Sequence, residues 1–226
     1  MGDHVPVAES PPCVFCGRSD RAMTREHIFA RWLIQKIHGA RLVTTASVTP
    51  DAEPVRISRV IATVCATCNA GWMSGLEVSF RRLVFARSRA GVIAAVDRTA
   101  LSRWFTKTAV LLATAHNAKL VDATGRAALL TAVPPAITVT LARRRRPPQR
   151  LDYALELDVD GDEPVAHRVS ILVDDLVANV APKGTLTGRH GTQLWPLRTH
   201  VLRWETLPVL SSRVGAAAKS HSARRP

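Results

Sequence analysis

Apolar residues recur every three or four positions in three stretches of the first 116 residues, which is the repeat of one face of an α-helix. The pattern predicts helices over residues 29–38, over about four turns from Asn69, and over 99–116. The middle helix carries an apolar stripe that we interpret as core packing, made of Trp72, Leu76, Phe80, Leu83 and Val84. Away from this stripe, Glu77 and Arg81 stand four residues apart, so an ion pair between them is favoured over a metal contact by Glu77.

Beyond Pro134 the apolar repeat shortens to two residues, which is the repeat of a strand with one buried face. Strands are predicted over residues 137–142, 151–159 and 165–173. They are expected to form an antiparallel meander. The arginine-rich run 143–150 joins the first two strands and is predicted to be a hairpin loop.

These elements predict an α+β protein whose parts follow one another along the chain. We expect a flexible N-terminus (1–12), a compact module (13–90), a helical region (91–133), an antiparallel β region (134–212) and a disordered basic tail (213–226). Within the module, residues 42–64 combine β-branched residues with two prolines and predict two strands around a turn. The second strand would lead directly into Cys65.

Composition and charge narrow the class of protein. The 226 residues are 46% hydrophobic, which is enough to bury a core. The formal net charge of +13 favours a polyanionic partner such as nucleic acid. No apolar run reaches the roughly 18 residues of a membrane span, and residues 1–10 lack the apolar core of a signal peptide. We therefore expect a soluble, cytoplasmic protein with no membrane partner.

The four cysteines form two Cys-x-x-Cys pairs, which are separated by 48 residues and made of Cys13, Cys16, Cys65 and Cys68. Two such pairs supply the four thiolates of a closed tetrahedral zinc site. Disulfides or unligated thiols are the alternatives, and disulfides would require an oxidising compartment. We interpret the pairs as a structural Zn²⁺ site that holds a small module together.

Three further polar residues belong to the same segment of the chain. Glu26 and His27 lie between the two cysteine pairs, and Asn69 directly follows the second pair. A carboxylate, an imidazole and an amide can serve a second, catalytic metal ion, which suggests a nuclease. A solvated Glu-His pair is the alternative for the first two residues, and a helix N-cap is an alternative or additional role for Asn69.

Residues 13–80 resemble the HNH endonucleases of the ββα-metal type, in the subgroup with two zinc-binding Cys-x-x-Cys knuckles. The resemblance rests on Arg25-Glu26-His27-Ile28-Phe29 and on Cys65-Ala66-Thr67-Cys68-Asn69. It implies that His27 is the general base and that Glu26 and Asn69 bind a catalytic Mg²⁺ or Mn²⁺ ion. The family usually has Asp at the position of Glu26, and its middle Asn has no counterpart here, so Ser58 or Thr63 would have to orient His27.

The resemblance and the basic charge together predict a metal-dependent endonuclease that hydrolyses DNA phosphodiester bonds. The residues expected to contact nucleic acid are basic and comprise Arg25, Arg81, Arg82, Arg143, Arg144, Arg145 and Arg146. One alternative is a catalytically inactive zinc protein that binds nucleic acid through the same fold. Another is a protein-interaction module in which zinc serves folding alone.

Overall fold

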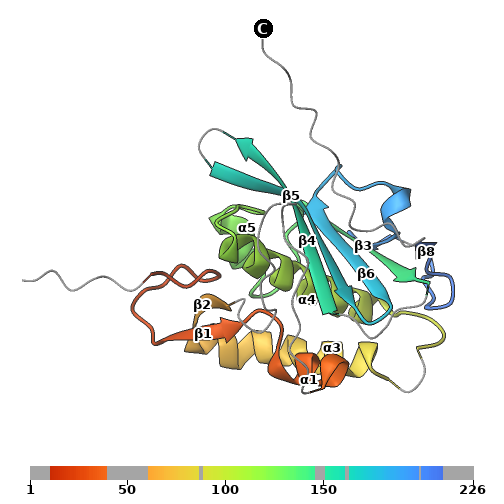
Figure 1. Cartoon of the computed structure of the whole chain (residues 1–226), viewed down its shortest axis with the longest axis horizontal. Coiled ribbons are helices and arrows are strands. Elements are labelled where there is room, and N and C mark those ends of the chain that lie inside the picture. The colour runs from red at the N-terminus through yellow and green to blue at the C-terminus, as the bar shows by residue number, and fades with distance from the viewer. Residues whose placement is uncertain are drawn as a thin grey trace, which may run out of the picture.

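The structure is a computed structural model that describes residues 11–39, 61–86, 89–145, 151–160, 163–198 and 200–210. It is a mixed α+β fold with two sheets (Figure 1). Some predictions lie outside the described residues. They concern the N-terminal residues 1–10, the first of the two strands expected in 42–64, Ser58, Arg146 and the tail 213–226.

The smaller sheet is a two-stranded antiparallel ribbon. Its strands are β1 (Met23–His27) and β2 (Ile61–Cys65), with Glu26 opposite Ala62. Between them in sequence lies α1 (Arg31–His38). The predicted helix end at residue 38 is confirmed: the C-cap is Gly39, whose φ of 62° lies in the left-handed region that glycine adopts without strain.

The helix predicted from Asn69 is confirmed, but a short helical turn precedes it and it is bent near its beginning. After β2 the chain forms a short turn, α2 (Ala66–Cys68), then a π-helical turn, η2 (Asn69–Met73), and then α3 (Ser74–Val84). The bend lies at Gly71, whose ψ of −112° is not helical. The predicted apolar stripe is also confirmed: Leu76, Phe80 and Val84 are buried, and Trp72 and Leu83 pack against the core.

The long helix α4 (Ala95–Ala115) joins the two parts of the protein into one core. It begins four residues before the predicted start, and its middle is buried on all sides. On one side the Phe80 ring of α3 stacks on Trp104, with ring centroids 3.5 Å apart. On the other sides α4 contacts β3, β5, β6 and β7 of the larger sheet. Figure 1 shows α4 between the larger sheet and the layer that contains β1 and α3.

The larger sheet has six strands in the order β4-β5-β6-β3-β7, with β8 beside the end of β3. All its pairings are antiparallel except that of β8 with β3. The strands and the two short helices of this region are α5 (Ala123–Ala128), β3 (Ile137–Arg144), β4 (Leu151–Asp160), β5 (Glu163–Val173), β6 (Leu176–Pro182), η3 (Gly188–His190), β7 (Thr192–Trp195) and β8 (Val209–Leu210). The predicted antiparallel pairing is therefore confirmed for β4 with β5, whereas β6 was not predicted as a strand.

The predicted hairpin between β3 and β4 is wrong. β3 pairs with β6 and β7, whereas β4 pairs with β5 at the other end of the sheet. The reason is burial: residues 137–142 of β3 are buried on both faces, which requires a central position in the sheet. In the sheet, β3 and β4 are therefore separated by β6 and β5. Arg143 and Arg144 belong to β3 itself and do not lie at a loop tip.

Candidate metal centre and active site

The first cysteine pair lies on a tight turn that packs against the β1–β2 ribbon. The Gly17 backbone N–H donates to the Cys13 carbonyl at 2.9 Å, and Gly17 has a φ of 68°. The second pair is positioned differently, because Cys65 ends β2 and Cys68 lies in α2. The Val14 N–H donates to the Thr63 carbonyl of β2 at 3.4 Å. The turn and the strand end are thereby held side by side.

The four thiols form one cluster that can hold a metal ion such as zinc. The Sγ atoms of Cys13, Cys16, Cys65 and Cys68 all lie within 4.8 Å of one another. Zn–S bonds of about 2.3 Å in a tetrahedron require S···S distances of roughly 3.8 Å. The Cys16 and Cys65 Sγ atoms are 3.7 Å apart, which fits this edge and is far too long for a disulfide bond. All four cysteines are free thiols.

The local electrostatics favour a thiolate at Cys65. Burial by itself raises the pKa of this thiol, but hydrogen bonds from the Cys68 backbone N–H and from the neighbouring thiols outweigh burial and lower the pKa to about 6. The Cys68 N–H lies 3.5 Å from the Cys65 Sγ atom. At Cys68 itself burial prevails and raises the pKa. A bound cation would favour the thiolate form of all four ligands.

Glu26 and Asn69, which are 43 residues apart in sequence, are in direct contact. The Asn69 Nδ2 atom donates to Glu26 Oε2 at 2.8 Å and to Thr24 Oγ1 at 3.2 Å. Thr24 and Glu26 share a face of β1 because they are two residues apart. The expected N-cap role of Asn69 is wrong, since Cys65 caps α2 and the Asn69 backbone is helical. Its side chain instead joins the helical segment to β1.

Thr24, Glu26 and Asn69 line a cavity of about 370 Å³ between β1, α1, α3 and α4. Their hydroxyl, carboxylate and amide oxygens are the ligand types that Mg²⁺ and Mn²⁺ prefer. The structure presents the Asn69 NH₂ group to Glu26. Coordination of a cation by Asn69 would require its amide to rotate so that the oxygen faces the carboxylate.

His27 is the last residue of β1 and does not belong to the lining of this cavity. Adjacent strand residues point to opposite faces, so Glu26 and His27 diverge from neighbouring backbone positions. Within the described residues, the buried His27 Nδ1 atom has no hydrogen-bond partner. Of the two residues considered for orienting His27, Thr63 forms no hydrogen bond to His27 Nδ1, and Ser58 lies outside the described residues.

The cavity also contains an ion pair that the sequence pattern does not predict. Glu77 accepts hydrogen bonds from Lys107 Nζ at 2.6 Å, from Trp104 Nε1 at 2.8 Å and from Trp32 Nε1 at 3.2 Å. The Lys107 side chain is only 3% exposed. The predicted Glu77–Arg81 pair is therefore wrong, because Glu77 turns inward towards α4. The sequence indicates this buried pair only by the presence of Lys107 within the apolar stretch of the helix predicted over 99–116.

The structure does not gather the candidate arginines at one place. Arg25 is exposed on β1, Arg81 and Arg82 lie in the last turn of α3, and Arg143 and Arg144 lie at the end of β3. Two of these cations are already paired: Arg82 with Asp97 at 3.0 Å, and Arg143 with Asp175 at 2.9 Å. Arg145 is exposed, and Arg146 is outside the described residues.

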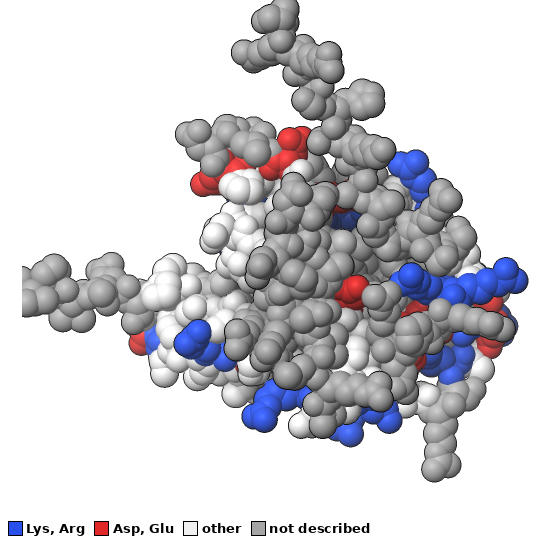
Figure 2. Space-filling view, in the orientation of Figure 1, with Lys and Arg blue, Asp and Glu red and all other residues white. Residues whose placement is uncertain are grey.

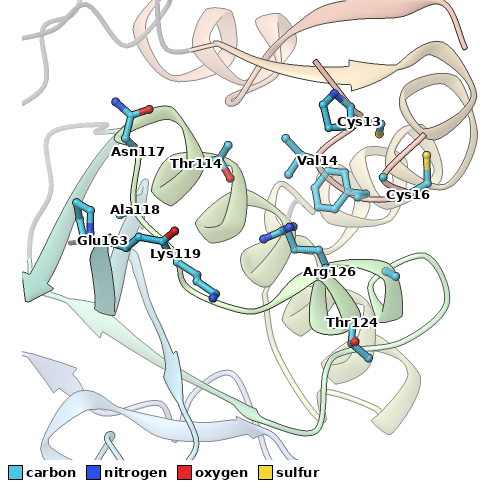
Figure 3. A pocket seen from close by; sticks show the side chains of 16 residues that line it. Cys13, Val14, Cys16, Thr114, Asn117, Ala118, Lys119, Thr124, Arg126 and Glu163 are labelled. Atoms are coloured by element: carbon cyan, nitrogen blue, oxygen red, sulfur yellow. The ribbon is translucent and has the colours of Figure 1, made fainter. Parts of the chain in front are cut away.

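A larger cavity, of about 990 Å³, lies beside the first cysteine pair (Figure 3). Cys13 and Cys16 line one side, and the end of α4, α5 and the start of β5 line the others. Its charged residues are Lys119, Arg126 and Glu163. None of Glu26, His27 and Asn69 lines it, so its size does not make it the place for the metal chemistry considered above.

Comparison with protein families, with curated proteins and with solved structures found no match to this chain. Within the described residues, none of the helices has the length and apolar character needed to cross a membrane.

Proposed function

We propose that the protein is a metal-dependent, HNH-type endonuclease that hydrolyses DNA phosphodiester bonds. The observation that carries this proposal is the contact between the Glu26 carboxylate and the Asn69 amide, at 2.8 Å, beside a cavity and next to the four-cysteine cluster. The cluster holds the strand end and the helical turn that flank this contact. A structural zinc ion there would position the helical segment that bears Asn69.

In this proposal, Glu26 and Asn69 supply oxygen ligands to Mg²⁺ or Mn²⁺. Such an ion neutralises charge on the scissile phosphate and on the leaving oxygen. His27 removes the proton from the attacking water, since an imidazole titrates near neutral pH. Because the Glu26 and His27 side chains leave β1 in different directions, the phosphate has to lie across the end of this strand for both residues to act on it.

The net charge of +13 supports a nucleic-acid substrate. Among the predicted contact residues, Arg25 and Arg81 have exposed side chains and no ion pair with a described residue. Arg25 lies on β1 beside Glu26, and Arg81 lies on α3, which directly follows the helical turn that begins at Asn69. They are therefore the arginines best suited to hold a backbone near the cavity.

The alternative function is a zinc-containing adaptor that binds nucleic acid without cleaving it. One observation favours it: His27 does not line the cavity that Glu26 and Asn69 share, and its Nδ1 atom has no partner among the described residues. A general base normally depends on a second group that fixes its ring orientation.

The experiment that separates these functions measures binding and cleavage on the same His27→Ala variant. Zinc-loaded protein is incubated with supercoiled plasmid and Mg²⁺ or Mn²⁺, and binding to labelled DNA is measured without added divalent cation. An endonuclease loses cleavage by about 10²- to 10⁴-fold and retains binding. His167→Ala is a matched control, because this histidine lies on β5 with a half-exposed side chain.

The proposal fails if wild-type protein binds DNA in a salt-sensitive manner but nicks no plasmid with either metal, which is the adaptor's behaviour. It also fails if His27→Ala and His167→Ala cleave at the wild-type rate. DNA binding that is absent at low salt would point to a module in which zinc serves folding alone.

A further inference from the structure

A groove of about 910 Å³ runs between α1 and the end of α3, next to the candidate active site. Its lining residues come from both helices and comprise Trp32, Gln35, Lys36, Val78, Arg81, Arg82, Phe85 and Ala86. Trp32 lines this groove and also the cavity of Glu26 and Asn69. The two hollows therefore adjoin at the Trp32 side chain.

The groove has an excess of positive charge. Three of its lining residues are basic, and none is acidic. Glu77, the acidic residue four positions before Arg81, is engaged by Lys107 and the two indoles, and no carboxylate of the described residues forms an ion pair with Arg81. Lys36 likewise forms no ion pair with a described residue. Figure 2 shows lysine and arginine side chains along the lower edge, where Figure 1 places α1 and α3.

The floor of the groove is apolar and aromatic. The Trp32 and Phe85 rings meet edge to face, with centroids 5.8 Å apart at 87°. The Arg81 guanidinium carbon lies 5.5 Å from the centre of the Trp32 ring. Val78 is 68% exposed and adds apolar surface to the groove. The Trp32 N–H bond to Glu77 fixes the position of the indole ring.

Basic residues beside an apolar, aromatic floor favour an unpaired nucleic-acid strand over a duplex. A duplex hides the faces of its bases and offers mainly phosphates to a cationic surface. An unpaired strand offers both phosphates and base faces, and proteins bind it with cations beside aromatic rings. Arg82 is paired with Asp97, but Lys36 and Arg81 have no acidic partner among the described residues, so a groove with these two cations beside an aromatic floor matches the second pattern.

We propose that the α1–α3 groove binds a single nucleic-acid strand and leads it to the cavity of Glu26 and Asn69. Lys36 and Arg81 contact successive phosphates, and the Trp32–Phe85 floor and Val78 contact bases. The inference rests on the proposed function, because it makes this strand the substrate of that cavity. It adds that the substrate is single-stranded or locally unpaired.

The test is fluorescence anisotropy with zinc-loaded protein and labelled oligonucleotides of about 20 nucleotides, longer than the usual footprint of such sites. No divalent cation is added, so cleavage does not contribute. A strand of mixed sequence is compared with its duplex. Each phosphate contact on a single strand adds about 0.7 to the salt exponent, which at about 0.15 M salt corresponds to roughly fourfold in affinity.

The double variant Lys36→Ala/Arg81→Ala should therefore bind the single strand roughly 14-fold more weakly, with a salt exponent smaller by about 1.4. Val78→Glu places a carboxylate in the groove at an exposed site and should also weaken single-strand binding. The matched control, Lys183→Ala/Arg189→Ala, removes two exposed cations away from the groove. Its affinity for the single strand should stay within twofold of that of the wild-type protein, about the range expected for surface changes.

Three results would overturn the inference: wild-type protein that does not bind the single strand, duplex bound more tightly than the single strand, or groove variants that bind like the control. These outcomes are independent of cleavage. If the groove variants lose binding but wild-type protein nicks no nucleic acid, the proposed nuclease fails and the binding groove stands. If wild-type protein cleaves and the groove variants bind and cleave normally, only the groove assignment fails.

Discussion

The Glu77 carboxylate, whose side chain is 18% exposed, offers the sharpest test of the energetics around the candidate active site. It accepts hydrogen bonds from one lysine and two indoles, at 2.6 Å, 2.8 Å and 3.2 Å. Glu77→Ala removes all three hydrogen bonds at once. Lys107, whose side chain is 3% exposed, is then left as a buried ammonium without its carboxylate.

The magnitude follows from this geometry. Breaking a buried ion pair from one side costs about 3–5 kcal/mol, and an unpaired buried indole N–H costs about 1–3 kcal/mol. Water that enters the cavity offsets part of this sum, so we expect Glu77→Ala to destabilise the fold by about 4 kcal/mol. For a chain of this size the melting temperature would fall by roughly 8–16 °C. Lys107→Met leaves Glu77 with two indole donors and should cost about 2 kcal/mol.

The assay is urea unfolding of zinc-loaded protein for the two single variants and the double variant. Because both charges are absent from Glu77→Ala/Lys107→Met, the double variant should be more stable than the sum of the single effects by about 2 kcal/mol. Arg82→Ala is the control, since its pair with Asp97 is exposed and should contribute less than about 1 kcal/mol. Additive single effects, or a Glu77→Ala cost as small as that of the control, would refute the reasoning.

Three further predictions concern the rest of the molecule. Cys65→Ser should lose the single zinc ion that we expect per chain and lower the unfolding midpoint, as measured by elemental analysis and urea titration; wild-type protein without zinc would contradict this. Burial lowers the pKa of His116. Below about pH 6.5 the unfolded chain therefore binds more protons than the folded state, and the protein should become less stable as the pH is lowered. Urea midpoints at pH values of about 5 and 8 should differ less in His116→Gln, and an unchanged difference would exclude this cause. Gly191→Ala should cost at least about 2 kcal/mol, because φ is 119° and an added Cβ would lie 2.7 Å from a β3 carbonyl oxygen. An added Cβ at Gly75 in α3 meets nothing within 4 Å, so Gly75→Ala should stabilise the fold by about 0.5–1 kcal/mol. Equal changes in the free energy of unfolding for Gly191→Ala and Gly75→Ala, measured in urea, would contradict this reasoning.

Local patterns predict the helices and the metal cluster well. α4 is recognisable because its apolar residues repeat every three or four positions, and α1 ends at the predicted residue 38. The cysteine cluster is predictable because two Cys-x-x-Cys pairs supply the four ligands of a structural zinc site. The Glu26–Asn69 contact was anticipated through a family resemblance, and the structure places these two side chains together.

Features that depend on tertiary partners were not predictable from local patterns. Glu77 has a suitable partner four residues away in Arg81, but the buried ammonium of Lys107 provides a stronger one in three dimensions. The β3–β4 hairpin was expected because the strands are adjacent in sequence, whereas burial of both faces moved β3 to the centre of the sheet. No strand is predicted over 176–182, because its residues are buried on both faces and show no alternation.

The rate of plasmid nicking as a function of Mn²⁺ concentration is the most direct test of a catalytic metal at Glu26 and Asn69. If Glu26 binds the ion, Glu26→Gln should raise the Mn²⁺ concentration needed for half-maximal rate by at least about tenfold. His27→Ala should lower the maximal rate by about 10²- to 10⁴-fold even at saturating Mn²⁺. Nicking that needs no added divalent cation, or a Glu26→Gln variant with the wild-type Mn²⁺ dependence, would contradict the assignment of this site.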